Sequence, residues 1–155
     1  MAGYGSEGGG ATVNQLEWQK VAEERLKDAK VLLDGGRWEF AYYATGYVVE
    51  CGLKSCILAR MIHTGWVFEE KWDAKVCRVH NLDKLVDIAG LRDQLNDELT
   101  ASPAAGGVFA ANWTMASNWN SSSRYEARTE AEAKGLYSAV EDQAHGVLQW
   151  LRKYW

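Results

Sequence analysis

The chain contains a single proline, Pro103, among its 155 residues. Proline ends or kinks an α-helix, because it lacks a backbone N–H and its ring clashes with the preceding turn. Long stretches of this chain can therefore stay helical. The sequence also has no run in which β-branched residues alternate with polar ones between turns, which is the pattern typical of strands. These features together predict an all-α protein.

Capping boxes predict where the first and last long helices begin. Asn14 is followed three residues later by Glu17, and Thr129 by Glu132, so each side chain can satisfy a free backbone N–H of the other. Apolar residues then recur every three or four positions, as one face of a helix requires. The first stripe consists of Trp18, Ala22, Leu26, Ala29 and Leu33, and the last of Leu136, Val140, Ala144, Val147, Leu151 and Tyr154. We expect a helix over 15–33 and one long helix from Thr129 to the end of the stripe.

The segment 38–62 is apolar almost all round, which is typical of a central helix. Gly46 and Gly52 within it can let a neighbouring helix come close. Shorter helices are predicted over 82–89, with Asn81 as the cap and Gly90 as the stop, near 91–99, and in the alanine- and tryptophan-rich piece after Gly107. The segment 66–79 has no clear pattern.

The predicted architecture is an up-and-down antiparallel bundle of four to five helices. It occupies residues 14–155 and is preceded by a flexible glycine-rich tail over 1–13, which cannot bury apolar area. With 47% apolar residues, the chain can form a real core.

Charge and cysteine content exclude several classes of protein. A net charge of −4 argues against binding to duplex DNA, which requires a basic face. Three cysteines, Cys51, Cys56 and Cys77, without a C-x-x-C pair favour reduced thiols and a cytoplasmic protein. No metal-ligand cluster and no P-loop is present in the sequence, so we expect no metal and no cofactor. Charged residues within 40–62 make that stretch a core helix rather than a membrane span.

Several motifs, taken in order, resemble the HEPN family (higher eukaryotes and prokaryotes nucleotide-binding). The first is R-L-x-D-A at 25–29, followed by the turn at Gly35-Gly36. The second is A-x(5)-E-x-x-L-K, which runs from Ala44 through Glu50 to Lys54, and the third is H-x-L-x-x-L at 80–85. The resemblance spans about 16–155 and implies a helical bundle that homodimerises. Arg124-Tyr125 before the last helix is also similar to many members.

The resemblance implies three alternative functions. Many members bind nucleotides or partners without catalysis and work with a separate nucleotidyltransferase in toxin–antitoxin pairs, and we favour this function. Others are ribonucleases that use R-x(4–6)-H, but none of His63, His80 and His145 follows an arginine at that spacing. A divergent ribonuclease toxin is therefore the second alternative. A dimeric scaffold without a small-molecule ligand is the third.

The candidate phosphate-binding residues are Lys54, His80, Arg124, Tyr125 and Arg128. Lys54 stands four residues after Glu50, so the two can also simply pair along a helix. His80 precedes a helix cap and can serve packing instead. The last three stand just before a helix N-terminus, where free N–H groups and arginines favour an anion. Glutamates at 126, 130 and 132 compete for the same charge.

Eight tryptophans raise the alternative of base stacking, although core positions are the simpler interpretation. Trp66, Trp72, Trp113 and Trp119 are the ones most free to stack. Trp38, Trp150, Tyr154 and Trp155 are instead expected to supply aromatic surface for a homodimer.

Overall fold

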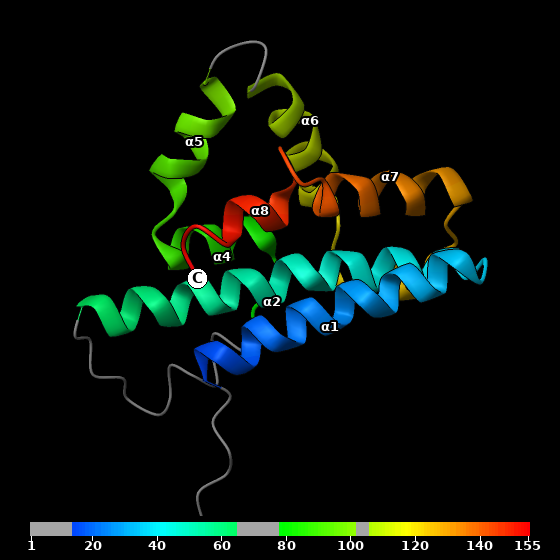
Figure 1. Ribbon diagram of the computed structural model, residues 1–155, viewed down its shortest axis with the longest axis horizontal. Coiled ribbons are helices and arrows are strands. Elements are labelled where there is room, and N and C mark those ends of the chain that lie inside the picture. Colours follow the sequence, from blue (N-terminus) through cyan, green and yellow to red (C-terminus); the bar gives the residue numbers. More distant parts are fainter. Residues whose placement is uncertain (1–13, 65–77, 102–105) are drawn as a thin grey trace, which may run out of the picture.

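A computed structural model describes residues 14–64, 78–101 and 106–155. Seven α-helices, one 3-10 helix and no strand occur in these ranges (Figure 1), which confirms the predicted all-α fold. The helices are α1 (Gln15–Asp34), α2 (Trp38–Thr64), α4 (Leu82–Ala89), α5 (Arg92–Thr100), α6 (Gly106–Ser117), η1 (Ser121–Tyr125), α7 (Glu130–Glu141) and α8 (Val147–Leu151). The tail 1–13, Trp66, Trp72 and Cys77 lie outside the described residues.

The predicted start of α1 is confirmed by its cap. The Asn14 side chain accepts from the Glu17 N–H at 3.0 Å, and the Asn14 N–H donates to Glu17 at 2.7 Å. The same reciprocal arrangement joins Thr129 and Glu132 at the start of α7. Each cap satisfies backbone donors that a helix N-terminus leaves without partners.

The long helix α2 is the centre of the molecule. It packs against α1, α4, η1, α7 and α8. Figure 1 shows α1 and α2 as a long side-by-side pair, with α7 and α8 on another side of α2. Its residues Val48, Val49 and Leu53 are fully buried, as expected of a helix that is apolar nearly all round. Phe40 and Ile62, at its two ends, are exposed.

Gly52 of α2 lets helix α8 come close, as predicted, whereas the close neighbour of Gly46 is Trp119, which lies between α6 and η1. A Cβ on Gly46 would lie 2.1 Å from the Trp119 ring, and one on Gly52 would lie 2.9 Å from Leu151. Both distances are shorter than carbon atoms can approach, so only glycine fits without movement. These contacts seat Trp119 and α8 directly against the α2 backbone.

The short helix α4 matches its prediction at both ends. Asn81 accepts from the Lys84 N–H at 2.9 Å, and Gly90 ends the helix at φ 68°. Glycine takes this left-handed conformation without the steric cost of a Cβ. The chain then turns directly into α5.

The prediction of one long final helix is wrong, because the chain breaks between α7 and α8. The Asp142 carboxylate accepts from the backbone N–H groups of Ala144 at 2.9 Å and His145 at 2.6 Å, which replaces helical hydrogen bonds. These two hydrogen bonds also lower the pKa of Asp142. A Cβ on Gly146 would lie 2.3 Å from the Asp142 carbonyl, so the turn needs glycine there.

The tryptophans expected to be most free to stack are buried where they are described. Trp113 and Trp119 belong to the core, which excludes them as open stacking platforms. Trp150 is only 2% exposed, so its expected place on a dimer surface is also wrong. Trp38, Tyr154 and Trp155 are partly buried against the core and keep some exposed area. None of the helices within the described ranges is long and apolar enough to cross a membrane.

Candidate functional site

A buried ion pair lies in the middle of α2. Glu50 and Lys54 stand one helical turn apart, and the Lys54 Nζ lies 2.7 Å from the Glu50 Oε1. Their side chains are 1% and 3% exposed. The Lys54 ammonium also lies 5.1 Å from the centre of the Trp18 ring of α1, a cation–π distance. Lys54 is therefore a buried partner of Glu50 rather than a surface cation.

His80 meets the same carboxylate from the other side. It lies just before the Asn81 cap of α4, and its Nδ1 is 2.9 Å from the Glu50 Oε1. Because an ionised carboxylate only accepts hydrogen bonds, Nδ1 is the donor and Nε2 is left as the second ring nitrogen. The His80 side chain is 48% exposed. Glu50 thus holds an imidazole whose other edge lies toward solvent.

This arrangement has a definite chemical capacity. A carboxylate that accepts from Nδ1 selects the tautomer and orients the ring, as carboxylates do for metal-bound and catalytic histidines. The outer nitrogen can then accept a proton, or donate a hydrogen bond to an anionic oxygen when protonated. The Glu50 Oε2 is buried and has no hydrogen-bond partner in the described part of the chain. Glu50 therefore keeps acceptor capacity that Lys54 and His80 do not use.

Arg128 is held by acids and by an aromatic ring. Its guanidinium lies 4.2 Å from the centre of the Tyr42 ring. It also pairs with Glu126, and with Glu132 at 3.5 Å. The pKa of Glu132 is lowered first by the hydrogen bond from the Thr129 backbone and, less strongly, by Arg128. The two acids offset the charge of Arg128, whose contacts connect the loop before α7 and α7 itself to α2.

Arg124 and Tyr125 are, like His80, exposed members of the candidate set. Both belong to η1, which packs on α2. The Arg124 guanidinium lies 4.7 Å from the centre of the Tyr125 ring, and Tyr125 is 79% exposed. Across 14–64, 78–101 and 106–155, no acid pairs with Arg124. This pair offers solvent a cation and an aromatic face together.

The structure divides the five candidate residues between two places. Lys54 and His80 meet at Glu50. Arg128 instead contacts Tyr42, eight residues earlier on α2, and at 1.5 Å per residue this separation is about 12 Å along the helix.

Glu50 is the residue of this candidate site that the sequence analysis did not include in its candidate set. Its spacing to Lys54 predicted the ion pair, but nothing in the sequence indicated that His80, thirty residues later, shares the same oxygen. Cys51 and Cys56 are buried and free, and burial raises the pKa of each thiol to about 12. Neither is a nucleophile at neutral pH. In the described ranges, no group of three histidines, cysteines or acids could hold a metal ion.

Comparison with known proteins places these observations in a family. The model of the HEPN domain matches residues 15–154, nearly the whole chain. No curated protein and no solved structure gave a match. The matched range covers both α2, with Glu50 and Lys54, and the start of α4, with His80. The chain therefore belongs to the HEPN domain family.

Proposed function

We propose that this chain is a nucleotide- or RNA-binding module whose phosphate contact is made by His80. Membership of the HEPN family supports a nucleotide- or RNA-related module. The observation that carries the proposal is the half-exposed imidazole held by the buried Glu50 at 2.9 Å. Because Glu50 fixes the orientation of the His80 ring, the ring loses little conformational freedom when an anion binds. Its hydrogen bond therefore adds more affinity than one from a freely rotating ring.

Lys54 has an indirect part in this proposal. A buried carboxylate without a cation is strongly disfavoured, so the Lys54 ammonium stabilises the Glu50 carboxylate that contacts His80. Lys54 is thus a positioning residue, because its side chain is only 3% exposed. Arg124 and Tyr125 supply a second contact, in which the ring stacks on a base and the guanidinium meets a phosphate.

Binding without cleavage is the favoured activity. The chain has no R-x(4–6)-H, the motif that the family's ribonucleases use to hold and cleave the phosphate. The second candidate is a divergent ribonuclease, which is favoured by the same Glu50–His80 pair, since an oriented imidazole is also suited to proton transfer. Incubation with RNA separates the two functions, because cleavage that disappears in His80→Ala would favour the enzyme.

We expect His80→Ala to weaken binding of ATP or a short single-stranded RNA by roughly 10- to 150-fold, the equivalent of about 1.5–3 kcal/mol for a charged hydrogen bond. Arg124→Ala should weaken RNA binding by a smaller factor. Calorimetric titration into each variant measures both effects, and thermal melts check that each variant folds.

His145→Ala is the matched control. The hydrogen bonds of His145 are made by its backbone, which donates to Asp142 and accepts from Asn112. Its binding should equal that of the unmodified chain. Equal binding by His80→Ala would place the site elsewhere, and no binding of either ligand to the unmodified chain would favour the scaffold.

We also infer that the chain forms a homodimer. HEPN domains often dimerise, and several large apolar side chains remain exposed, among them Val31, Phe40 and Ile62. Light scattering at micromolar concentration should return twice the 17.3 kDa of one chain. A mass of one chain, unchanged up to about 0.1 mM, a concentration that would populate even a weak dimer, would reject the dimer.

The separate partner that we propose is a nucleotidyltransferase, as in the toxin–antitoxin pairs of this family. Co-expression with a nucleotidyltransferase encoded next to this chain should yield a complex that survives gel filtration. Separate elution of the two proteins would contradict the proposed partnership.

A further inference from the structure

Helix α1 brings a second cation, Arg25, to the part of α2 that carries Glu50. Figure 1 shows α1 and α2 side by side, and a short turn joins them, so the two helices run antiparallel. The Trp18 ring of α1 lies 5.1 Å from the Lys54 ammonium of α2, measured to the ring centre. Arg25 follows Trp18 by seven residues, nearly two full turns, so it leaves the same side of α1 about 10 Å further along. On α2, this level lies within about one helical turn of Glu50.

The charge of Arg25 acts on this part of α2. Cys51 follows Glu50 directly, and burial raises the pKa of its thiol to about 12. Lys54 and Arg25 lower that pKa by smaller amounts, as positive charges do when they lie near a thiol. The Lys54 ammonium is held by Glu50 at 2.7 Å, whereas Arg25 pairs with no group of α2 in the described ranges. Of the two cations, Arg25 is therefore the one that Glu50 does not hold.

The partner of Arg25 is weakly held. The Arg25 Nε lies 3.1 Å from the Asp28 Oδ2, and the two side chains are 45% and 53% exposed. Surface ion pairs of this kind contribute little, because water screens both charges. Among the described residues, neither Nη group of Arg25 has a hydrogen-bond partner. The planar guanidinium thus keeps two donor groups that suit a phosphate.

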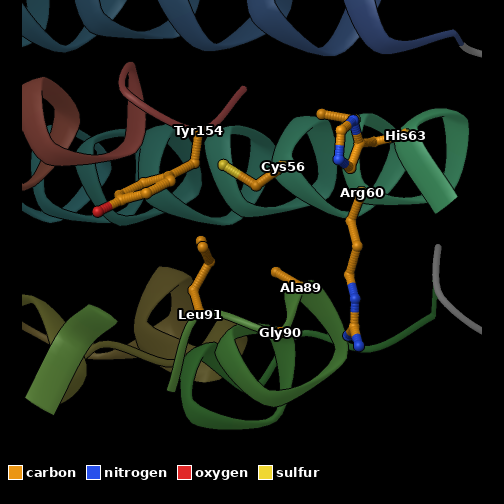
Figure 2. A pocket seen from close by; sticks show the side chains of 8 residues that line it. Cys56, Arg60, His63, Ala89, Gly90, Leu91 and Tyr154 are labelled. Carbon is orange, nitrogen blue, oxygen red and sulfur yellow. The ribbon is translucent and has the colours of Figure 1, made fainter. Parts of the chain in front are cut away.

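A different part of α2 forms the pocket that Figure 2 shows. Its lining includes Arg60 and His63 of α2, together with the junction of α4 and α5. The Arg60 Nη1 donates to the Ile88 carbonyl at 2.9 Å, so this guanidinium is engaged within the protein. Neither Arg25 nor His80 lines the pocket. The pocket is therefore separate from the place where α1 and the start of α4 flank Glu50.

We propose that Arg25 is the second anion-contacting residue of the Glu50–His80 site, and that one phosphate group lies between the Arg25 guanidinium and the His80 imidazole. Their side chains are 45% and 48% exposed, so both are open to a ligand. A phosphate has oxygens on several sides and can accept hydrogen bonds from two elements at once. The inference rests on the proposed function for its ligand. It adds a residue that no sequence motif joins to His80.

Arg25→Ala should weaken binding of a short single-stranded RNA roughly 10-fold or more, because a charged hydrogen bond to the phosphate is lost. Lys27→Ala is the matched control, since Lys27 is another cation of α1, paired with Glu24 at 2.8 Å and 71% exposed. His63→Ala, in the pocket of Figure 2, is a second control. Neither control should change the affinity. Calorimetric titration measures each affinity, and thermal melts show whether each variant folds.

Asp28→Asn should change the affinity in the opposite direction. It removes the carboxylate that competes with the phosphate for Arg25, so the RNA should bind roughly 2- to 5-fold more tightly, the equivalent of a surface ion pair. Asp34→Asn is the control, because it makes the same charge change on α1 but releases Lys30 instead. A purely structural Arg25 would give no gain specific to Asp28→Asn. This variant also keeps the inference testable if Arg25→Ala fails to fold.

The double variant Arg25→Ala with His80→Ala tests whether both residues contact one phosphate. In that case, Arg25→Ala should weaken binding clearly less in the His80→Ala background than in the unmodified chain, because contacts to a shared group are not additive. Losses that multiply would place the two residues on different parts of the ligand and overturn the inference.

The outcomes also separate this inference from the proposed function. Binding lost in both single variants and retained in Lys27→Ala supports a phosphate held by Arg25 and His80. Binding lost only in His80→Ala leaves the proposed function standing and overturns the role of Arg25. Binding that is unchanged in both, or absent from the unmodified chain, overturns the proposed function and this inference with it.

Discussion

Replacing Glu50 by alanine should lower the free energy of unfolding by about 3–5 kcal/mol. The change removes the carboxylate that lies 2.7 Å from the Lys54 ammonium, whose side chain is 3% exposed. A charge taken out of water needs its partner, and removing one partner of a buried pair costs far more than the pair contributes. Urea unfolding followed by circular dichroism measures the loss.

The double variant Glu50→Leu with Lys54→Met is the control. It removes both charges and keeps similar volume, so its stability should be close to that of the unmodified chain. His80 would lose its orienting carboxylate in the same variant, so nucleotide binding should fall although the fold persists. A loss below about 1 kcal/mol for Glu50→Ala would contradict the buried pair, because surface pairs have that value.

Trp150→Ala should cost about 3–5 kcal/mol, the usual loss for a large aromatic residue in a core. The Trp150 ring lies 5.7 Å from Phe109, 6.0 Å from Trp113 and 5.5 Å from Tyr154, measured between ring centres. It therefore joins α8 to α6 and to the end of the chain. At about 2–4 °C per kcal/mol for a domain of this size, the melting temperature should fall by roughly 6–20 °C.

Trp150→Phe is the matched control for that prediction. The change removes the indole N–H but keeps an aromatic ring beside Phe109 and Tyr154. Phenylalanine keeps most of the apolar contact, and we expect a loss of less than about 1.5 kcal/mol. Equal losses in the two variants would show that the cavity is not the cause.

Local signals predicted most of the helices. Several helix ends lie where local sequence signals predicted them. These signals are the capping boxes at Asn14 and Thr129, the cap Asn81 and the stop Gly90. A cap involves residues within four positions of one another, so the sequence contains the whole interaction. The break at Asp142 was missed because the apolar period continues through it, and a single aspartate side chain redirects the backbone.

The candidate site was less accessible to prediction, because its contacts join distant parts of the chain. The Glu50–Lys54 pair follows from helical spacing, but its burial depends on how the other helices cover α2. The meeting of His80 with Glu50 depends on where α4 begins in space. The exposed state of Arg124 and the enclosed state of Arg128 differ because only Arg128 reaches Tyr42.

The contact between Gly46 and the Trp119 ring ties together two positions far apart in the chain. A larger residue at 46 has no room unless position 119 becomes smaller, and a smaller residue at 119 leaves a void unless position 46 fills it. Either substitution alone lowers stability. Relatives that differ at these positions must therefore have passed through a less stable intermediate or changed both positions at once. In diverging HEPN sequences, positions 46 and 119 should therefore covary, with a small residue at one position wherever the other carries a large one.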